Sequence, residues 1–479
     1  MRKKLFLLLI ACTLQIIAVG QEMWGVVNGN YSGINSTLIN PANMLHTKLY
    51  MDVNVVTADL FFENNAFYIH KGDFKPVSFL RSDDNLPEYG KDSLPFDYYR
   101  NDQRKDLHFS ALVLGPSFSV SRRDDAFGFR TGFRTVLSAR DVPHELIPFS
   151  YEGLNYEPLH NINYNNDVML ITGMSWTEIG FSYARTIYRR GPDHLTAGIT
   201  AKFLLGVAGA YFDIENMDYI VNNDSTLNIR NIRGELGFSS STADGPLFSG
   251  MGFAFDLGLV YEKMSRGYSS YRSGKLCKQP YEDYHYRIGV SLLDLGLMNF
   301  KSDAQRHVYD DVGVFWENVD TVNFRNIDQF TQMLSNEFYG DPDASLASDR
   351  IKMILPAALS VQLDYHFRKQ WYLNATFMQP LMAGKAYIYR PAQIAVTPRY
   401  ETQYLEFSMP VSLYNYRYPR VGLSARFWFF TIGTDKLLGF FNLTDFTGMD
   451  IYISLKFNFL KGRCRSSGSQ CDYRPAWRK

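Results

Sequence analysis

Long segments in which apolar and polar residues alternate constrain this chain more than any other feature of its sequence. In residues 359–367 every second side chain is apolar, namely Leu359, Val361, Leu363, Tyr365 and Phe367. Residues 405–413 and 451–459 repeat the pattern. Because successive side chains of a strand point to opposite faces, each segment has one apolar face. About ten such residues let a tilted strand cross a bilayer, whereas strands of soluble sandwiches are usually nearer five or six residues.

Segments of this kind recur along the whole chain. We place them near 48–60, 107–119, 126–138, 174–188, 194–212, 250–262, 284–294, 356–367, 370–381, 402–413, 418–432 and 448–460. The links at 120–125, 189–193, 368–369 and 414–417 are tight and follow even-numbered segments, whereas the links after odd-numbered segments are long. Bacterial outer-membrane barrels place short turns in the periplasm and long loops outside.

The link at 261–283 is the exception, because it follows an even-numbered segment and is nevertheless long. Two long loops could hide a further hairpin, either around Tyr219 and Leu227 or within 386–396. The fold class that we predict is all-β: a transmembrane antiparallel β-barrel of about 14 strands (12–16), with an N-terminal hatch and long extracellular loops.

Composition excludes several other classes of protein. Lys+Arg and Asp+Glu are both 49, so bulk electrostatic attraction to nucleic acid is not expected. No apolar run of eighteen residues follows the N-terminus, which excludes a helical membrane protein. Aromatic residues make up 15% of the chain, and we expect many of them to face lipid.

The termini predict export and divide the chain. Arg2, Lys3 and Lys4 precede an apolar stretch that ends in a small-residue cleavage site at Gly20. We therefore predict a signal peptide over 1–20, a hatch over 21–47, a barrel over 48–460 and a basic periplasmic tail over 461–479. The predicted location is the outer membrane of a Gram-negative cell. Lipoprotein processing at Cys12 is the alternative.

Charged residues on the polar faces of the segments should point into the barrel. They are Arg130, Arg134, Lys202, Asp256, Arg287, Asp364, Glu406, Arg426, Asp450 and Lys456. Both signs occur in similar numbers, which favours pairs across the lumen over an ion-selective pore. We therefore expect a narrow or plugged lumen.

The sequence offers few residues for catalysis or metal binding. It lacks the motifs of common hydrolases and nucleotide-binding enzymes, so no enzymatic activity, cofactor or metal is expected. Alternation directs His285 and His366 into the lumen, where either could assist a serine as in a barrel hydrolase. The pairs Asp83–Asp84 and Asp310–Asp311 could bind calcium weakly or simply be solvated.

Two further segments lie outside the alternating pattern. Residues Ile327, Phe330, Leu334 and Phe338 have helical spacing behind Asn326, a plausible N-cap, and predict a loop helix. In the tail, Cys464 and Cys471 could form a disulfide or remain free thiols, and Cys277 would be left over. The basic charge of the tail is either solvated or docks an acidic partner or lipid headgroups.

Short motifs resemble a known superfamily. The turn Asn40–Pro41–Ala42, the segment Phe253–Tyr261 and the segment Arg287–Gly296 are similar to parts of the FadL-like transporters and the related PorV-type barrels. The chain as a whole resembles a family of outer-membrane barrels from Bacteroidota that begins with a W-G-V-x-N pattern, here Trp24 to Asn28. The resemblance implies a fourteen-stranded barrel with an N-terminal hatch and no assigned activity. Asn43 stands where the transporters usually have glycine.

Three functions follow from these patterns. The first is passage of a small hydrophobic molecule through a plugged barrel, gated by residues 23–47. The second is a scaffold or accessory barrel for secretion or surface assembly. The third is a barrel hydrolase that uses His366. The expected partners are outer-membrane lipid, the barrel-assembly machinery and a periplasmic protein at the tail, with no nucleic acid.

Overall fold

The computed structural model describes residues 22–73, 87–90, 93–122, 124–240, 246–265, 283–322, 324, 326–381 and 384–460. Several predictions fall outside these residues. They are the signal peptide, processing at Cys12, the pair Asp83–Asp84, Cys277, the tail, and the pairing of Cys464 with Cys471.

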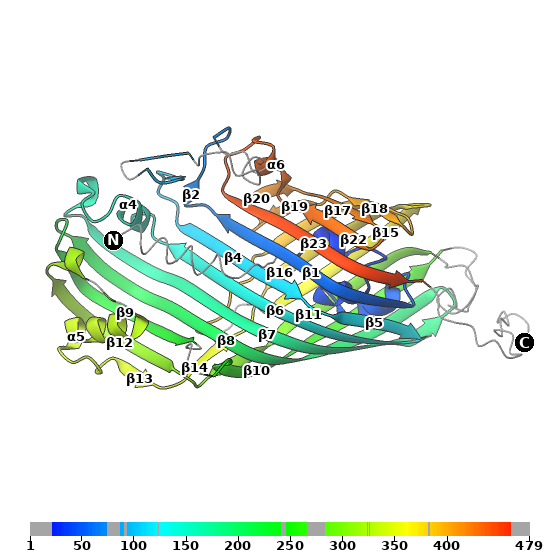
Figure 1. The fold of residues 1–479 in the computed structure, drawn as a ribbon, viewed down its shortest axis with the longest axis horizontal. Coiled ribbons are helices and arrows are strands. Elements are labelled where there is room, and N and C mark those ends of the chain that lie inside the picture. Colours follow the sequence, from blue (N-terminus) through cyan, green and yellow to red (C-terminus); the bar gives the residue numbers. More distant parts are fainter. Residues whose placement is uncertain are drawn as a thin grey trace, which may run out of the picture.

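Antiparallel strands close into a barrel (Figure 1). The strands of the wall are β1 (Met51–Asn64), β4 (Lys105–Leu114), β5 (Ser117–Arg122), β6 (Asp125–Val142), β7 (Asn163–Arg190), β8 (Asp193–Val221), β9 (Leu227–Ser240), β10 (Gly250–Met264), β11 (Tyr284–Phe300), β12 (Ala304–Trp316), β13 (Leu346–Ser348), β14 (Ile351–Ile354), β15 (Ala358–Arg368), β16 (Trp371–Pro380), β17 (Gln393–Glu401), β18 (Leu405–Ser408), β19 (Val411–Tyr414), β20 (Tyr418–Val421), β21 (Leu423–Phe427), β22 (Phe430–Thr434) and β23 (Gly448–Phe459).

The sheet closes because β1 pairs with β23 on one side and with β4 and β5 on the other. Several of these strands are collinear pieces of one wall strand. Thus β4 and β5 pair in succession with β1, and β9 and β10 pair in succession with β8. Counted in this way, the wall has 14 strands, and the predicted fold class is confirmed.

The outer face of the wall is apolar. Along β10 the exposed side chains are Met251, Phe253, Phe255, Leu257 and Leu259, and the residues between them face the interior. Exposed aromatic residues continue around the wall, among them Phe127, Phe181, Phe367, Trp371 and Trp428. A closed barrel with an apolar outer face is the architecture of outer-membrane proteins, in which no backbone edge meets lipid.

Three predictions about the strands near the C-terminus were wrong. Residues 418–432 form two wall strands and not one, because Trp428 and Phe429 turn the chain between β21 and β22. The long link 382–401 contains β17, a full wall strand paired with β16. Because this additional strand precedes it, the tight link 414–417 lies at the long-loop end of the barrel. The sequence had predicted it at the opposite end, among the short turns.

One group of strands extends far beyond the others. β7 and β8 have 28 and 29 residues, although about ten suffice to cross a bilayer. Their outer halves pair with each other, β8 also pairs with β9, and β9 pairs with β12, so these strands form a sheet that projects at the left of Figure 1. The hairpin that the sequence left open around Tyr219 and Leu227 is the turn between β8 and β9, and other parts of the predicted loops are also strands.

Short elements cover the long-loop end. They are β2 (Phe67–Tyr68), β3 (Asp97–Tyr98), α4 (Leu146–Tyr151), η3 (Glu157–Leu159), η4 (Val319–Thr321), α5 (Ile327–Tyr339) and α6 (Leu437–Phe440). The helix expected from its spacing is α5, and Oδ1 of Asn326 caps it by accepting from the backbone N–H of Gln329 at 2.9 Å. Leu334 and Phe338 pack against the projecting sheet. No helix among the described residues is long and apolar enough to span a membrane.

The outer face of β10 provides a test of which residues meet lipid. We expect Leu257→Arg to destabilise the folded barrel by about 2–4 kcal/mol, because an arginine near the middle of the bilayer loses its hydration. Phe315→Arg is the matched control, since Phe315 is exposed on the projecting part of β12 and should cost less than about 1 kcal/mol. Refolding into lipid vesicles across a urea series measures both; equal costs would contradict this placement of the membrane.

Candidate functional site: a hatch in the lumen and a vestibule above it

The segment that follows the predicted signal peptide lies inside the barrel. Its elements are α2 (Trp24–Val27), η1 (Gly33–Leu38) and η2 (Pro41–His46), which Figure 1 shows in blue within the wall strands. Nearly all of its residues are buried. We call described residues 22–47 the hatch.

Asn40 both shapes the hatch and joins it to the wall. Its Oδ1 accepts from the backbone N–H of Ala42 at 3.0 Å, and Pro41 occupies the first turn of η2, where its missing N–H does no harm. Its Nδ2 donates to Oε1 of Gln362 at 3.0 Å and to the carbonyl of Leu259 at 3.2 Å. One amide therefore bonds the hatch to β15 and β10.

Glycines of the wall make room for this turn. Gly198 on β8 and Gly258 on β10 are paired across the two strands. A Cβ at Gly198 would lie 2.4 Å from the backbone nitrogen of Ala42, and one at Gly258 would lie 2.1 Å from Oδ1 of Asn40. A side chain at either position would thus occupy space that the hatch fills.

Polar bonds hold the rest of the hatch to the wall. The backbone N–H of Ile34 donates to both carboxylate oxygens of Asp52, at 3.1 and 3.0 Å. Nζ of Lys456 donates to the carbonyl of Tyr31 at 2.7 Å, and Nη1 of Arg130 donates to Oγ1 of Thr37 at 2.9 Å. The hatch is therefore bonded to side chains from several parts of the wall.

Asn30 of the hatch connects two further buried charges. Its Nδ2 donates to Oε2 of Glu401 at 2.7 Å, and its Oδ1 accepts from Nη1 of Arg287 at 2.8 Å. Arg287 in turn pairs with Glu262 at 2.8 Å.

The ten charged residues that the sequence predicted to point into the lumen lie inside the barrel. Most of them form ion pairs. Lys202 bonds Asp256 at 2.7 Å and Asp294 at 2.6 Å, and Arg134 bonds Asp294 at 3.0 Å. In the same network Arg130 lies 3.8 Å from Asp256. The remaining pairs are Asp364 with Arg399 at 3.0 Å, Glu406 with Arg426 at 3.0 Å and Lys456 with Asp52 at 4.0 Å.

Sequence reasoning missed several partners in these pairs. Glu178, which pairs with Arg130 at 3.3 Å, follows the alternation of β7 and could have been found from it. Asp294 lies where the backbone of β11 has a positive φ of 53°, so its side chain is out of phase with the pattern. Arg399 lies in the strand β17, which was expected to be a loop.

Asp450 belongs to a different group, near the start of the hatch. Its carboxylate accepts from the backbone N–H of Asp435, and Asp435 Oδ2 accepts from the backbone N–H of Trp24 at 3.0 Å. Burial, reinforced by the charge of Asp450, holds the pKa of Asp435 well above its usual range. The first turn of the hatch is thus bonded to a buried carboxyl group.

The two histidines that alternation directed into the lumen have different surroundings. His285 is exposed on the outer face beside Tyr365, because the alternation of β11 shifts by one residue near its beginning. The ring nitrogens of His366 lie 3.2 Å and 2.8 Å from the carbonyls of Tyr284 and Lys369, so the ring is positioned by backbone groups.

The acidic pair of the outer sheet is engaged by an arginine. Arg233 pairs with Asp310 at 3.3 Å and with Asp311. Among the described residues, no group of three histidine, cysteine or acidic side chains is arranged to hold a metal ion.

A cavity of about 490 Å³ opens at the long-loop end, and we call it the vestibule. Four tyrosines line it, Tyr99, Tyr389, Tyr414 and Tyr418, together with several amide side chains. Its charged lining residues are three acids and three bases: Glu63, Asp106, Asp445, Arg140, Arg420 and Lys436. Glu63 is bonded to Lys436 at 2.7 Å and to Arg420 at 2.5 Å, so part of this charge is paired.

The lumen below the vestibule is nearly filled. A cavity of about 50 Å³ lies between the wall and Glu22, Met23 and Leu38 of the hatch. Another of about 30 Å³ lies beside Asn28 and His46. Each has space for only a few waters, whereas the vestibule could hold a small molecule. His108 and Tyr389 line both the vestibule and the cavity of about 50 Å³.

Residues 41–435 match a family of unknown function, DUF5723. The chain belongs to this family. No curated protein matches the sequence. The predicted relation to PorV-type barrels and to Bacteroidota proteins stays a prediction.

Solved structures similar to this chain include a transporter and a channel. The Ralstonia pickettii toluene transporter TbuX is 10% identical, with 92% of this chain and 99% of that chain covered and a TM-score of 0.42. A mutant of the monoaromatic hydrocarbon channel TodX is 9% identical over 92% and 98% of the two chains, with a TM-score of 0.44. A Pseudomonas aeruginosa FadL homologue is 10% identical over 93% and 99%, with a TM-score of 0.23.

The close approach at Gly198 predicts how to dislodge the hatch. In Gly198→Ala the new methyl group would overlap the backbone of Ala42, so we expect proteolysis of residues 22–47 in the purified barrel to accelerate about tenfold. Gly180→Ala on β7 is the control, because its Cβ would meet no atom closer than 3.6 Å. Equal cleavage of the two variants and the wild type would show that the turn does not depend on this contact.

Proposed function

We propose that this protein passes small hydrophobic molecules across the outer membrane and that the hatch gates their passage. The observation that carries the proposal is the contrast between the vestibule, at about 490 Å³, and the two cavities of about 50 and 30 Å³ beside the hatch. A molecule that enters from the long-loop end meets a closed lumen, so passage requires the hatch to move.

The lining of the vestibule supports an uncharged cargo with an apolar body. Tyrosine rings offer flat apolar surface, and their hydroxyl groups can bond a polar substituent. Acidic and basic residues are equal in number and partly paired with each other, so the cavity does not favour an ion of either sign. A long, fully saturated chain would leave many of these polar groups without partners.

The hatch joins the wall by bonds that can be broken without unfolding the barrel. Most of them are single hydrogen bonds to charged side chains, each worth about 1.5–3 kcal/mol net, whereas the wall strands share continuous backbone ladders. Movement of residues 22–47 is therefore the opening step that disturbs the fold least.

Cross-linking the hatch to the wall tests the gate. Nδ2 of Asn35 lies 3.0 Å from Oγ1 of Thr57 on β1, so cysteines at these positions can be bridged by dibromobimane in a variant whose native cysteines are serine. We expect the bridged protein to lose at least about nine-tenths of its uptake of radiolabelled toluene into a Gram-negative host without its own aromatic channel. The two single-cysteine variants, treated with the same reagent, should keep their uptake.

Deletion of residues 23–47 should have the opposite effect and raise the conductance of the barrel in planar bilayers. The proposal fails if wild-type protein gives no uptake above that of the empty host. It also fails if bridging and deletion leave uptake and conductance unchanged.

A second function, as a scaffold for secretion or surface assembly, is favoured by the projecting sheet. This sheet extends beyond the membrane-facing part of the wall, and Phe315 and Val168 are exposed on it. If the scaffold is the main function, an envelope pull-down should recover a stoichiometric partner with the wild type and lose it with Phe315→Arg. Recovery of no partner by either protein would count against this function.

A further inference from the structure

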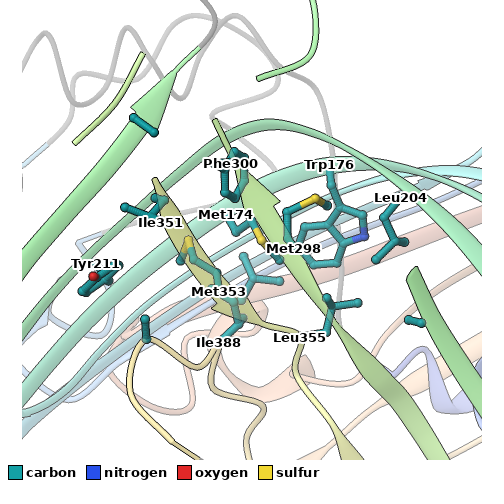
Figure 2. Close-up of a cluster of buried hydrophobic side chains, with 14 residues drawn as sticks. Met174, Trp176, Leu204, Tyr211, Met298, Phe300, Ile351, Met353, Leu355 and Ile388 are labelled. Carbon is teal, nitrogen blue, oxygen red and sulfur yellow. The ribbon is translucent and has the colours of Figure 1, made fainter. Parts of the chain in front are cut away.

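The loop between β16 and β17 turns into the barrel. In its described part, residues 384–392, the backbone N–H of Ile388 donates to the carbonyl of Ile354 at 2.9 Å, and that of Ile354 donates to Ala386 at 3.1 Å. Ala386 and Ile388 are buried in an apolar cluster with Met353 and Leu355, as Figure 2 shows for Ile388. We call residues 384–392 the inner loop.

Tyr389 of the inner loop faces two cavities. It lines the vestibule and also the cavity of about 50 Å³ above the hatch. Its hydroxyl donates to Oδ1 of Asn415 at 2.9 Å, and the guanidinium of Arg140 lies 4.1 Å from the centre of its ring. Burial raises the pKa of Tyr389 to about 12, so the hydroxyl remains a donor at neutral pH.

The next residue, Arg390, reaches the hatch. Its Nε donates to Oε1 of Glu22 at 2.7 Å, and its Nη2 lies 2.6 Å from the same oxygen. Its Nη1 lies 3.3 Å from Oδ2 of Asp294, which belongs to the charge network of the wall. Both members of the Arg390–Glu22 pair are largely buried, so the loss of either would leave a charge without solvent to replace its partner.

From this arrangement we infer that the inner loop is a second gate and that Arg390 couples it to the hatch. The inference rests on the proposed function, because it takes the hatch as the element that opens. Tyr389 and Arg390 are adjacent on one backbone, so a molecule that displaces Tyr389 from the vestibule also moves Arg390. A shift of only about 1 Å takes a 2.6 Å ion pair beyond good hydrogen-bond geometry. Occupancy of the vestibule thereby loosens the hatch.

Linkage makes this inference quantitative. If a molecule in the vestibule weakens the hold on the hatch by some factor, release of the hatch strengthens binding in the vestibule by the same factor. Breaking the Arg390–Glu22 pair by mutation should therefore loosen the hatch and tighten the binding of a vestibule ligand together. If the ion pair were merely structural, its loss would loosen the hatch and leave the binding of the vestibule ligand unchanged or weaker.

The test measures labelling of the hatch and binding in the same purified barrel. Ser36→Cys is introduced into protein whose native cysteines are serine, and its reaction with a maleimide reports movement of the hatch. We expect Glu22→Gln and Arg390→Ala each to label about tenfold faster than the parent, within the usual range of such couplings. Toluene should speed labelling of the parent and have little further effect on Arg390→Ala, and it should bind both variants more tightly.

Arg230→Ala is the matched control, because Arg230 forms an ion pair with Asp218, at 3.0 Å, in the projecting sheet. It should label and bind as the parent does. Arg390→Lys keeps the charge and should fall between the parent and Arg390→Ala, which separates loss of the ion pair from misfolding.

Two results would overturn the inference. One is unchanged labelling in both Glu22→Gln and Arg390→Ala. The other is faster labelling with toluene binding that is no tighter than in the parent. If labelling and binding respond as expected while cells take up no toluene, the coupling stands and the passage function alone is wrong.

Discussion

The buried charges of the lumen impose the constraint on which the rest of this structure depends. Asp52, Glu262, Arg399 and Glu401 are almost fully buried, and a charge so placed is tolerated only with partners that replace water. The wall supplies some of these partners by pairing one strand with another. The hatch supplies many of the rest through Asn30, Ile34 and Thr37.

Because the hatch supplies partners for buried charges of the wall, it is held inside the barrel. It is nevertheless fixed less firmly than a strand. Its polar bonds are numerous, but each is local and can be exchanged for a bond to water if the lumen opens. The glycines at 198 and 258 allow the turn at Asn40 to approach the backbone of the wall. The inner loop meets the hatch from the other side through Arg390, so the closed lumen is held from both ends.

How far sequence reasoning reached can be judged from particular strands. In β10 and β15 every second residue is apolar and the pattern gave both the strand and its outward face. In β17 the residues Ile394, Val396, Pro398 and Tyr400 alternate with others, but the proline argues against a central strand. The sequence therefore predicted a long link here and left open only a hairpin within 386–396. Residues 418–432 kept a continuous pattern through a two-residue turn, because Trp428 and Phe429 are as apolar as the strands beside them. Alternation alone did not give the ion-pair partners of the inward residues, because pairing depends on register between strands far apart in the chain. A one-residue shift in β11 also places His285 on the outer face.

The sequence by itself determined the class of the protein: a closed antiparallel wall that is apolar outside and charged inside, with an Asn–Pro–Ala turn before its first strand. These features follow from local alternation and local turn chemistry, which the order of residues specifies directly. Only the tertiary structure decided which residues fill the lumen, that Asn40 bonds to β10 and β15, and that Glu22 meets Arg390. Those contacts join residues hundreds of positions apart, and they exist only once the barrel has closed and has brought its inner faces around the hatch.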